Sequence, residues 1–256
     1  ANVGTTTGAG LIAGFGLKVK ISAYAMPMLV FGVILIFQNS KALKGVGYIL
    51  AGLGFLFLGI SHMKDGFEAF KDTINLAEYA VSGYPGLFLF TAMGIFATVV
   101  MQSSHATLVL ILTALAAGQI TYENGLALAI GANVGTTITA IIGSLSANVQ
   151  GKRLAGAHLI FNMTTGLIAI VFIHQFVIAV DYLSSAVGIA HDDYTLKLAV
   201  FHTIFNLVGI LVMIPFIGKL DYYLTRFMRD KVTKVSQPKY LYNASIDFPD
   251  TAVKSI

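Results

Sequence analysis

The chain has 256 residues, of which 56% are hydrophobic and only 11% are charged. A soluble globular domain carries about 25% charged residues, so this composition excludes an ordinary soluble surface, and it is too apolar for a disordered chain. The absence of cysteine excludes disulfides, thiol nucleophiles and cysteine-based metal sites. The net charge of +4 comes from short loops and one tail rather than from a nucleic-acid-binding face. The composition predicts a membrane protein built from helices packed in lipid.

Six apolar regions are long enough to cross, or nearly cross, a bilayer that needs about 20 helical residues. Four of them are uninterrupted: 21–37, 45–61, 154–180 and 198–218. The other two, 87–117 and 122–147, are interrupted by Gln102-Ser103-Ser104 and by Asn133-Val134-Gly135-Thr136-Thr137. Lipid cannot satisfy unpaired backbone groups, so such breaks are expected only where protein or an aqueous cavity surrounds them.

Region 62–86 alternates acidic and apolar residues and ends in Ser82-Gly83-Tyr84-Pro85, which predicts an amphipathic interfacial segment followed by a turn. Six basic residues from Lys219 to Lys239 follow the last apolar region and predict a cytoplasmic C-terminus, because cytoplasmic loops are rich in Lys and Arg. Counting back from that end puts Lys152 and Arg153 in the cytoplasm as well. This topology requires 87–117 to be a re-entrant hairpin that enters and leaves on one side.

The segment Ala1-Asn2-Val3-Gly4-Thr5-Thr6 recurs without change at residues 132–137. The topology puts the loops after the two copies on opposite sides of the membrane, as in the inverted repeats of many secondary transporters. The predicted fold is an all-α integral membrane protein, an inverted-repeat secondary transporter with re-entrant helical hairpins and broken helices. Its parts are the remainder of the first repeat with the interfacial segment (1–85), the second repeat (86–234) and a tail (235–256).

Gln102, Ser103 and Ser104 place an amide and two hydroxyls in the middle of an apolar hairpin, where an unpaired polar group is costly. A break there starts a second half-helix near Ser104, whose free N–H groups and positive dipole end face the gap. Such a helix end suits an anion, to which hydroxyls donate, while the Gln carbonyl accepts or binds a cation. The alternative is that these side chains only form hydrogen bonds between helices.

The two copies of the repeated motif offer oxygens that suit an alkali cation, and their glycines permit an unwound backbone with free carbonyls. Close helix packing at the small residues explains the motif equally well. His158 and His202 each precede an Asn by four residues on one helix face, which predicts polar contacts between neighbouring helices rather than a ligand site. Between Phe88 and Gln150 the only charge is Glu123, so a bound anion would need co-bound cations to balance it.

With these residues in place, the chain resembles the sodium/phosphate cotransporter family, specifically bacterial relatives of the type II sodium-dependent phosphate transporters. The resemblance rests on Thr98 followed by Gln102-Ser103-Ser104, on the segment from Gly131 to Thr137 and on two His-x-x-Phe-Asn segments, and it extends to about Lys234. It implies two inverted repeats, each with a Gln-Ser-Ser-Ser re-entrant hairpin, that meet near the midplane to hold phosphate and sodium.

By position, the resemblance assigns phosphate contacts to Gln102, Ser103, Ser104 and Thr107. It assigns sodium contacts to Gln102, Ser103, Asn133, Thr136, Thr137, Asn2, Thr5 and Thr6, with sodium as a co-transported ligand and no cofactor. His105 stands where the family usually has its third Ser, which puts one hydroxyl contact in question. The hairpin of the first repeat is absent from residues 1–256 and is expected upstream of Ala1. The tail after Gln237 resembles the lead into a PhoU-like regulatory domain.

The sequence thus predicts a multi-pass protein of the inner (plasma) membrane that carries out sodium-coupled symport of inorganic phosphate by alternating access around a midplane site. Two alternatives stay open: a phosphate-binding sensor or scaffold without transport, and a symporter of another small oxyanion. An enzyme is not expected, because no nucleophile has both an adjacent base and a group to orient it. The expected partners are phosphate, sodium and the lipid bilayer, without nucleic acid, and a homodimer is one assembly left open.

Overall fold

A computed structural model of the protein describes residues 2–16, 22–70 and 83–229, and every regular element in these ranges is helical. The elements in chain order are α1 (Asn2–Leu11), the π-helical turn η1 (Ile12–Gly16), α2 (Ser22–Ile36), α3 (Lys41–Phe70), α4 (Gly83–Met101), α5 (Ser104–Ala116), α6 (Tyr122–Ser144), α7 (Val149–Val171), α8 (Ile173–Ala186), α9 (Tyr194–Met213), the short 3-10 turn η3 (Ile214–Phe216) and α10 (Ile217–Phe227). The predicted all-α class is confirmed for these ranges, whereas the predicted tail 235–256 lies outside them.

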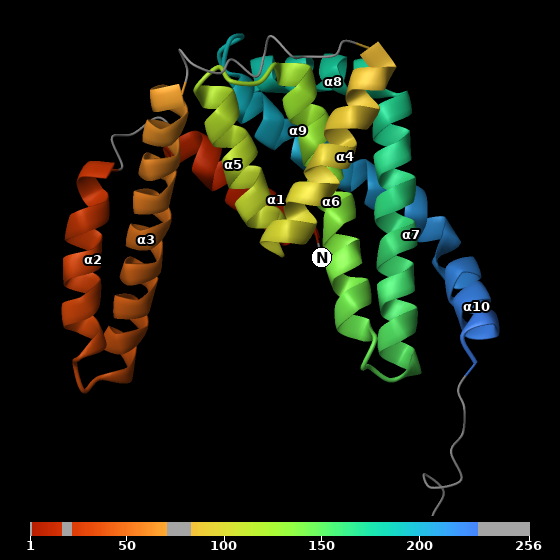
Figure 1. Ribbon diagram of the computed structural model, residues 1–256, viewed down its shortest axis with the longest axis horizontal. Coiled ribbons are helices and arrows are strands. Elements are labelled where there is room, and N and C mark those ends of the chain that lie inside the picture. The colour runs from red at the N-terminus through yellow and green to blue at the C-terminus, as the bar shows by residue number, and fades with distance from the viewer. Residues whose placement is uncertain (1, 17–21, 71–82, 230–256) are drawn as a thin grey trace, which may run out of the picture.

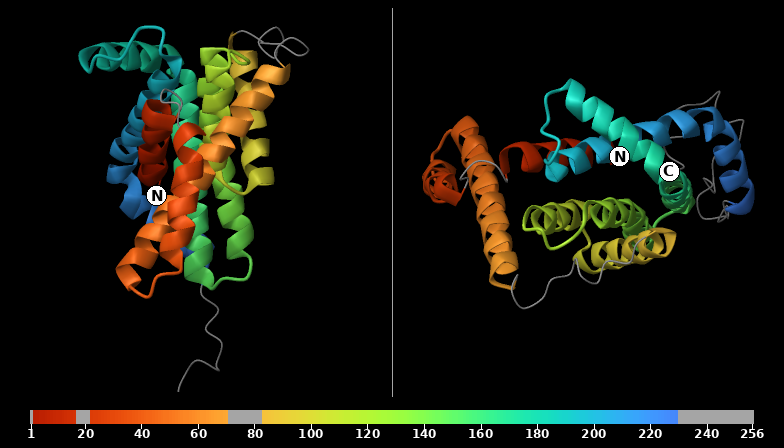
Figure 2. Two further views of the ribbon diagram at one scale, coloured as in Figure 1. Left: turned by 90° about the vertical axis from the view of Figure 1, so that its left-hand side faces the viewer. Right: turned by 90° about the horizontal axis from the view of Figure 1, so that it is seen from above.

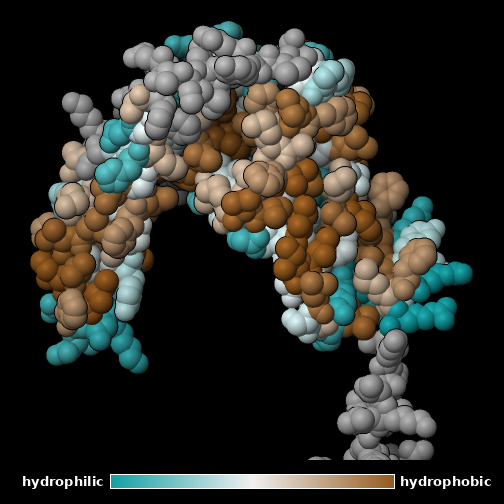
Figure 3. Space-filling model, viewed as in Figure 1, coloured by the Kyte–Doolittle hydropathy of each residue, from teal (hydrophilic) through white to brown (hydrophobic). Residues whose placement is uncertain are grey.

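The outer surface identifies the described part of the chain as a membrane protein. Five of its helical segments are long and apolar enough to cross a bilayer: Lys41–Gly66, Gly83–Met101, Tyr122–Ser144, Val149–Val171 and Tyr194–Phe227. Large apolar side chains point outward, and Phe96 and Leu154 are 71% and 72% exposed. Figure 3 shows brown, apolar surface along most of the helix flanks, with teal, polar side chains gathered mainly at their ends. Such a surface is stable in lipid and not in water.

Local signals in the sequence explain where several helices begin. Thr121, Asn148 and Asp193 precede α6, α7 and α9, and each side chain accepts a hydrogen bond from the backbone N–H three residues later. These caps satisfy one of the free N–H groups that every helix leaves at its start. The loops after α5 and α8 contain Gly118 and Gly188 with φ of +70° and +76°, a conformation that glycine adopts without strain.

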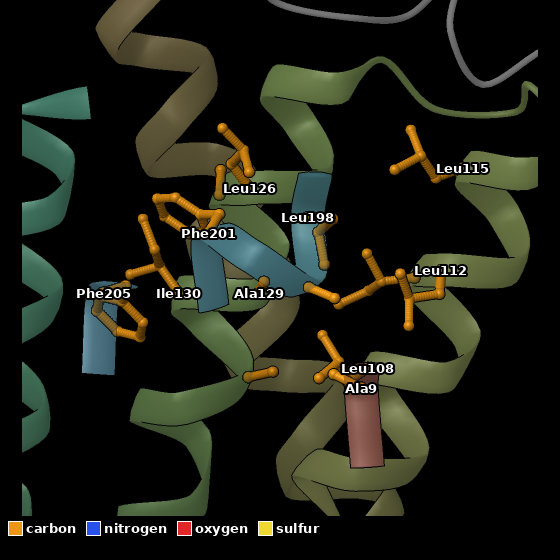
Figure 4. Close-up of a cluster of buried hydrophobic side chains, with 14 of the residues drawn as sticks. Ala9, Leu108, Leu112, Leu115, Leu126, Ala129, Ile130, Leu198, Phe201 and Phe205 are labelled. Atoms are coloured by element: carbon orange, nitrogen blue, oxygen red, sulfur yellow. The ribbon is translucent and has the colours of Figure 1, made fainter. Parts of the chain in front are cut away.

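The core lies where α5, α6 and α9 meet α1. Figure 4 shows leucines of α5 and α6 facing Leu198 and Phe201 of α9, with Ala9 of α1 beside Leu108. The rings of Phe201 and Phe205 stack with their centroids 5.8 Å apart. Helix α4 packs along α6 and adds Leu87 and Phe90 to this core, whereas α2 and α3 form a hairpin that contributes Ile60 of α3. Figures 1 and 2 show this hairpin at one side of the other helices, where α3 contacts α5, and Figure 3 shows a hollow between the hairpin and the rest of the molecule.

Four predicted features differ from the structure. Helix α6 is continuous through residues 133–137, because the hydroxyls of Thr136 and Thr137 bond to carbonyls of the preceding turn and the backbone ladder stays intact. The predicted span 154–180 ends at Val171, and the chain turns at Phe172 into α8. The predicted turn at 82–85 is helical from Gly83, where α4 begins, because a proline is tolerated in the first turn of a helix. The interfacial segment predicted at 62–86 is the end of α3 as far as Phe70, and residues 71–82 lie outside the described ranges.

Candidate functional site

The apolar hairpin formed by α4 and α5 breaks at Gln102 and Ser103, as the sequence predicts. Gln102 has a φ of +54°, which is unusual for a residue other than glycine, and its side-chain Nε2 donates to the Val99 carbonyl at 2.6 Å. Ser103 has extended backbone angles, and its hydroxyl accepts from the Ala106 N–H at 3.2 Å, so that α5 starts at Ser104. We call Gln102, Ser103 and Ser104 the hairpin tip. In Figure 1 the tip lies level with the middle of α6 and α7 rather than at their ends.

A buried pair of hydroxyls lies directly behind the hairpin tip. Thr98 of α4 donates to the Oγ1 of Thr107 of α5 at 3.0 Å, and Thr107 in turn donates to the Ser103 carbonyl at 3.1 Å. Both threonines are almost fully buried, at 0% and 1% exposed. These bonds tie the two arms of the hairpin to the backbone of the tip, which holds the Ser103–Ser104 turn in place.

Helix α6 brings the second copy of the repeated motif against this hairpin. A Cβ at Gly135 would lie 2.7 Å from the Cβ of Thr98 and 2.9 Å from the Ile95 carbonyl, so only glycine allows α4 to approach so closely. Gly135 stands between Asn133 and Thr137 in the motif. The tip, the hydroxyl pair and the second motif copy therefore adjoin one another.

The two motif copies are joined by a buried network of polar side chains. His202 of α9 lies between them, with its Nε2 3.1 Å from the Oδ1 of Asn133 and its Nδ1 3.2 Å from the Oγ1 of Thr6. An amide oxygen can only accept, so in the neutral imidazole Nε2 carries the proton and Nδ1 is an acceptor, which shares the Thr6 hydroxyl proton with the Asn2 carbonyl. One imidazole thus connects the first copy in α1 to the second copy in α6.

The same position of each motif copy also bonds to an Asn of one His–Asn segment. Asn2 donates to the Oδ1 of Asn162 in α7 at 2.6 Å, and Asn133 donates to the Oδ1 of Asn206 in α9 at 2.9 Å. The four amides are between 0% and 9% exposed. The predicted role of the His–Asn segments in holding helices together is confirmed for α7 and α9, although their partners are the motif copies rather than each other. His158 differs, because its buried Nε2 has no hydrogen-bond partner.

The remaining predicted site residues fall into two groups. Thr136 and Thr137 donate to carbonyls of their own helix, at 3.0 Å and 2.6 Å, which occupies their hydroxyl protons. The hydroxyls of Thr5 and Ser104, both half-buried, make no hydrogen bond within the described part of the chain. Gln102 is exposed, and its side-chain carbonyl oxygen accepts no hydrogen bond from the described residues.

A buried lysine is a feature that sequence reasoning missed. Lys197 in the first turns of α9 is 3% exposed, and its Nζ lies 2.7 Å from the Oδ1 of Asp181 of α8. The same Nζ lies 5.7 Å from the centroid of the Tyr194 ring. Asp181 is therefore one half of an ion pair that ties α8 to α9. The sequence signal for this buried charge was a lysine directly before an apolar run, which places it in the first turns of a membrane helix.

A cavity of about 610 Å³ lies beside the network, between α7, α9 and α10. Its lining includes Asn2, His158 and Asn206, but most of its wall is apolar, from residues such as Leu154, Phe161 and Leu220. None of the hairpin-tip residues lines it. The hairpin tip, rather than this cavity, carries the polar groups that could bind ions.

Comparison with known proteins gives the family. Residues 1–65 and 87–214 match the family described as "Na+/Pi-cotransporter". The chain belongs to this family. It is a family of transporters and not of enzymes, which agrees with the prediction from the sequence.

The matching relatives are bacterial proteins of greater length. The chain is 30% identical over 169 residues to "Putative inorganic phosphate export protein YjbB" of Escherichia coli (strain K12), an alignment that covers 65% of this chain and 30% of that protein. The Salmonella typhimurium protein of the same name is 29% identical over the same shares. "Uncharacterized protein YqeW" of Bacillus subtilis is 27% identical over 123 residues, which cover 48% of this chain and 38% of that protein. No solved structure gives a significant match to the chain.

Proposed function

We propose that the protein moves inorganic phosphate across the cell membrane by symport with sodium ions, and that the hairpin tip is the phosphate site. The observation that carries this proposal is the break at Gln102–Ser103 in a chain of the Na+/Pi-cotransporter family. We take the α4–α5 hairpin to be re-entrant, which its tip at the level of the middle of α6 and α7 supports.

The tip offers an anion both charge and hydrogen-bond donors. The N-terminal end of α5 carries a partial positive charge and free N–H groups. The unpaired hydroxyl of Ser104 adds a donor, and Ser103 and Thr107 hold the turn from behind. Since Lys and Arg are absent from residues 88–150, sodium ions are the counter-charge that this arrangement needs.

For sodium, the unsatisfied neutral oxygens are the strongest candidates: the Gln102 carbonyl, the Ser104 hydroxyl and the Thr5 hydroxyl. Asn133 uses its amide in bonds to His202 and Asn206, and Asn2 uses its nitrogen in the bond to Asn162. We propose that these asparagines position the motif copies. Each could contact sodium only through a lone pair of its amide oxygen that is not used in a hydrogen bond. In symport, phosphate and sodium must both be bound before the site closes to one side of the membrane and opens to the other.

The inverted-repeat architecture belongs to this proposal. It is supported by the identical motif copies and by their equivalent bonds, Asn2 to Asn162 and Asn133 to Asn206. A cytoplasmic C-terminus is supported by the basic side chains Lys152, Arg153, Lys219 and Arg226 near one end of α7 and in α10. Arg153 also donates twice to the Met228 carbonyl, which attaches the end of α10 to α7.

Phosphate export is a second candidate function, because two of the three relatives named above are described as putative inorganic phosphate export proteins. Export and uptake use the same site and differ in the direction of the driving gradient. Proteoliposomes with sodium imposed on one side or the other separate them, since a symporter moves phosphate with sodium whichever way the gradient points. Phosphate efflux that ignores the sodium gradient would favour export without sodium coupling.

The test of the proposal is sodium-dependent accumulation of labelled phosphate in proteoliposomes. We expect the double variant Gln102→Ala/Ser104→Ala to reduce the rate at low phosphate by roughly tenfold or more, since it removes two polar contacts. The matched control is Gln175→Ala/Ser185→Ala, which changes the same residue types at exposed positions of α8 and should leave uptake unchanged. Full uptake by the first variant contradicts the site assignment, and saturable phosphate binding without flux favours a sensor.

A further inference from the structure

The imidazole of His105 is seated on Gly8 of α1. A Cβ built on Gly8 would overlap the His105 ring, with the Nδ1 atom 2.9 Å away and the Nε2 atom 3.0 Å away. His105 is the second residue of α5 and directly follows Ser104 of the hairpin tip. Gly8 lies two residues after Thr6, which bonds to His202. The ring therefore touches the helix that carries the first motif copy.

The contact is made by shape and not by hydrogen bonding. His105 makes no hydrogen bond within the described part of the chain, and its side chain is only half-buried. One turn further along, Leu108 of α5 and Ala9 of α1 belong to the same buried apolar cluster and lie beside each other in Figure 4. Small residues of α1 thus receive larger side chains of α5, and His105 makes the contact next to the tip.

Within the described residues, the hydrogen bonds of the tip and of the hydroxyl pair stay inside the α4–α5 hairpin. Thr98 and Thr107 tie the tip to the opposite arm of its own hairpin, and Thr98 rests on Gly135 of α6. The contact between His105 and Gly8 joins the residue next to the tip to the helix that carries the first motif copy. A shift of this contact moves the Ser104 hydroxyl relative to Thr5, because His105 and Ser104 are consecutive in the chain.

We propose that His105 is a positioning residue, whose ring on Gly8 holds the hairpin tip against α1 and so sets the phosphate affinity of the site. This rests on the proposed function, because it takes the tip to be where phosphate binds. It also gives His105 a role of its own at the position where the family usually has a hydroxyl: the ring occupies space that Gly8 leaves open. Either residue then depends on the other.

The test is a double-variant cycle in reconstituted protein, with KM and kcat for phosphate and the melting temperature measured for each variant. His105→Ala removes the ring and is expected to raise KM roughly fivefold, because the tip loses its support. Gly8→Ala displaces the ring and is expected to raise KM roughly tenfold. Added to His105→Ala, Gly8→Ala should change KM by less than about twofold, because the new methyl group then has room.

Gly10→Ala is the matched control. Gly10 is half-buried like Gly8 and lies on the same helix, but a Cβ there meets nothing within 4 Å. It receives the same gain in helix propensity, so its KM should stay within about twofold of the unaltered protein. A change in KM equal to that of Gly8→Ala would mean that glycine itself, and not contact with His105, matters at both positions.

The outcomes separate the two proposals. Equal effects of Gly8→Ala with and without the ring overturn the role of His105, and so does a lower melting temperature or kcat at unchanged KM. If Gly8→Ala does not fold, recovery of folding in the double variant together with the raised KM of His105→Ala supports the proposal, and an unchanged KM in His105→Ala overturns it. Absence of any phosphate uptake by the unaltered protein contradicts the proposed function. Uptake with a KM that neither His105→Ala nor Gly8→Ala changes contradicts only this inference.

Discussion

Replacement of Asn133 by Ala tests whether the buried network stabilises the fold. The change removes a donor 2.9 Å from the Asn206 Oδ1 and an acceptor 3.1 Å from the His202 Nε2, and both of these partners are 1% exposed. A buried group left unpaired costs about 1–3 kcal/mol in soluble proteins, whereas hydrogen bonds between membrane helices average about 0.6 kcal/mol. Two lost bonds in a tightly packed site should therefore lower the free energy of unfolding by about 2 kcal/mol.

The assay is equilibrium unfolding in detergent, with Asn124→Ala as the comparison. Asn124 lies on the same helix and is 4% exposed against 2% for Asn133, but its Nδ2 has no hydrogen-bond partner. Its removal should cost less than about 0.5 kcal/mol, because an unsatisfied amide contributes no bond. Equal losses in the two variants would show that volume, and not the network, determines stability at these positions. Addition of Asn206→Ala to Asn133→Ala should cost less than it does alone, as expected of bonded partners.

Two further predictions concern helix packing. Gly135→Ala should lower stability by about 2 kcal/mol, because its methyl group would lie 2.7 Å from the Cβ of Thr98, whereas Gly143→Ala on the same helix meets nothing within 4 Å and should be neutral in a melting experiment. Asp181→Asn should lower the free energy of unfolding by about 1–2 kcal/mol, since it leaves the buried Lys197 charge without its carboxylate, and the 43% exposure of Asp181 reduces the loss. Lys197→Met removes the buried charge itself and should cost less than Asp181→Asn in the same assay, and the opposite order would contradict the ion-pair argument.

The two interrupted apolar regions show how far local sequence reasoning extends. Both contain polar residues in an apolar run, and the sequence predicts a break in each. At Gln102–Ser103 the prediction is confirmed, because a serine followed by a run of helix formers supplies a cap for a new helix. At residues 133–137 it is wrong, because threonine hydroxyls bond back to their own helix and the Asn side chain finds partners on α9. Whether polar residues break a helix depends on partners that are remote in the chain.

The contacts of the site could not be predicted for the same reason. The sequence places His105 directly after the two serines of the tip, but it does not show that the His105 ring lies on Gly8, 97 positions away. It shows two motif copies and two His–Asn segments, but not which asparagine bonds to which. Each of these pairs joins residues more than 70 positions apart, and no local periodicity carries that information.

Composition and hydropathy alone determined that this protein is a helical membrane protein. A chain with 11% charged residues cannot cover its surface in water. In lipid every backbone polar group needs a partner within the protein, and long apolar runs meet that need as helices. The motif spacing alone also identified the family and the place of the helix break. Tertiary structure decided which of the polar side chains form hydrogen bonds between helices and which, such as Ser104 and Thr5, keep a hydroxyl that is unpaired within the described residues. That division depends on distances of about 3 Å between separate helices, which packing determines and sequence spacing does not.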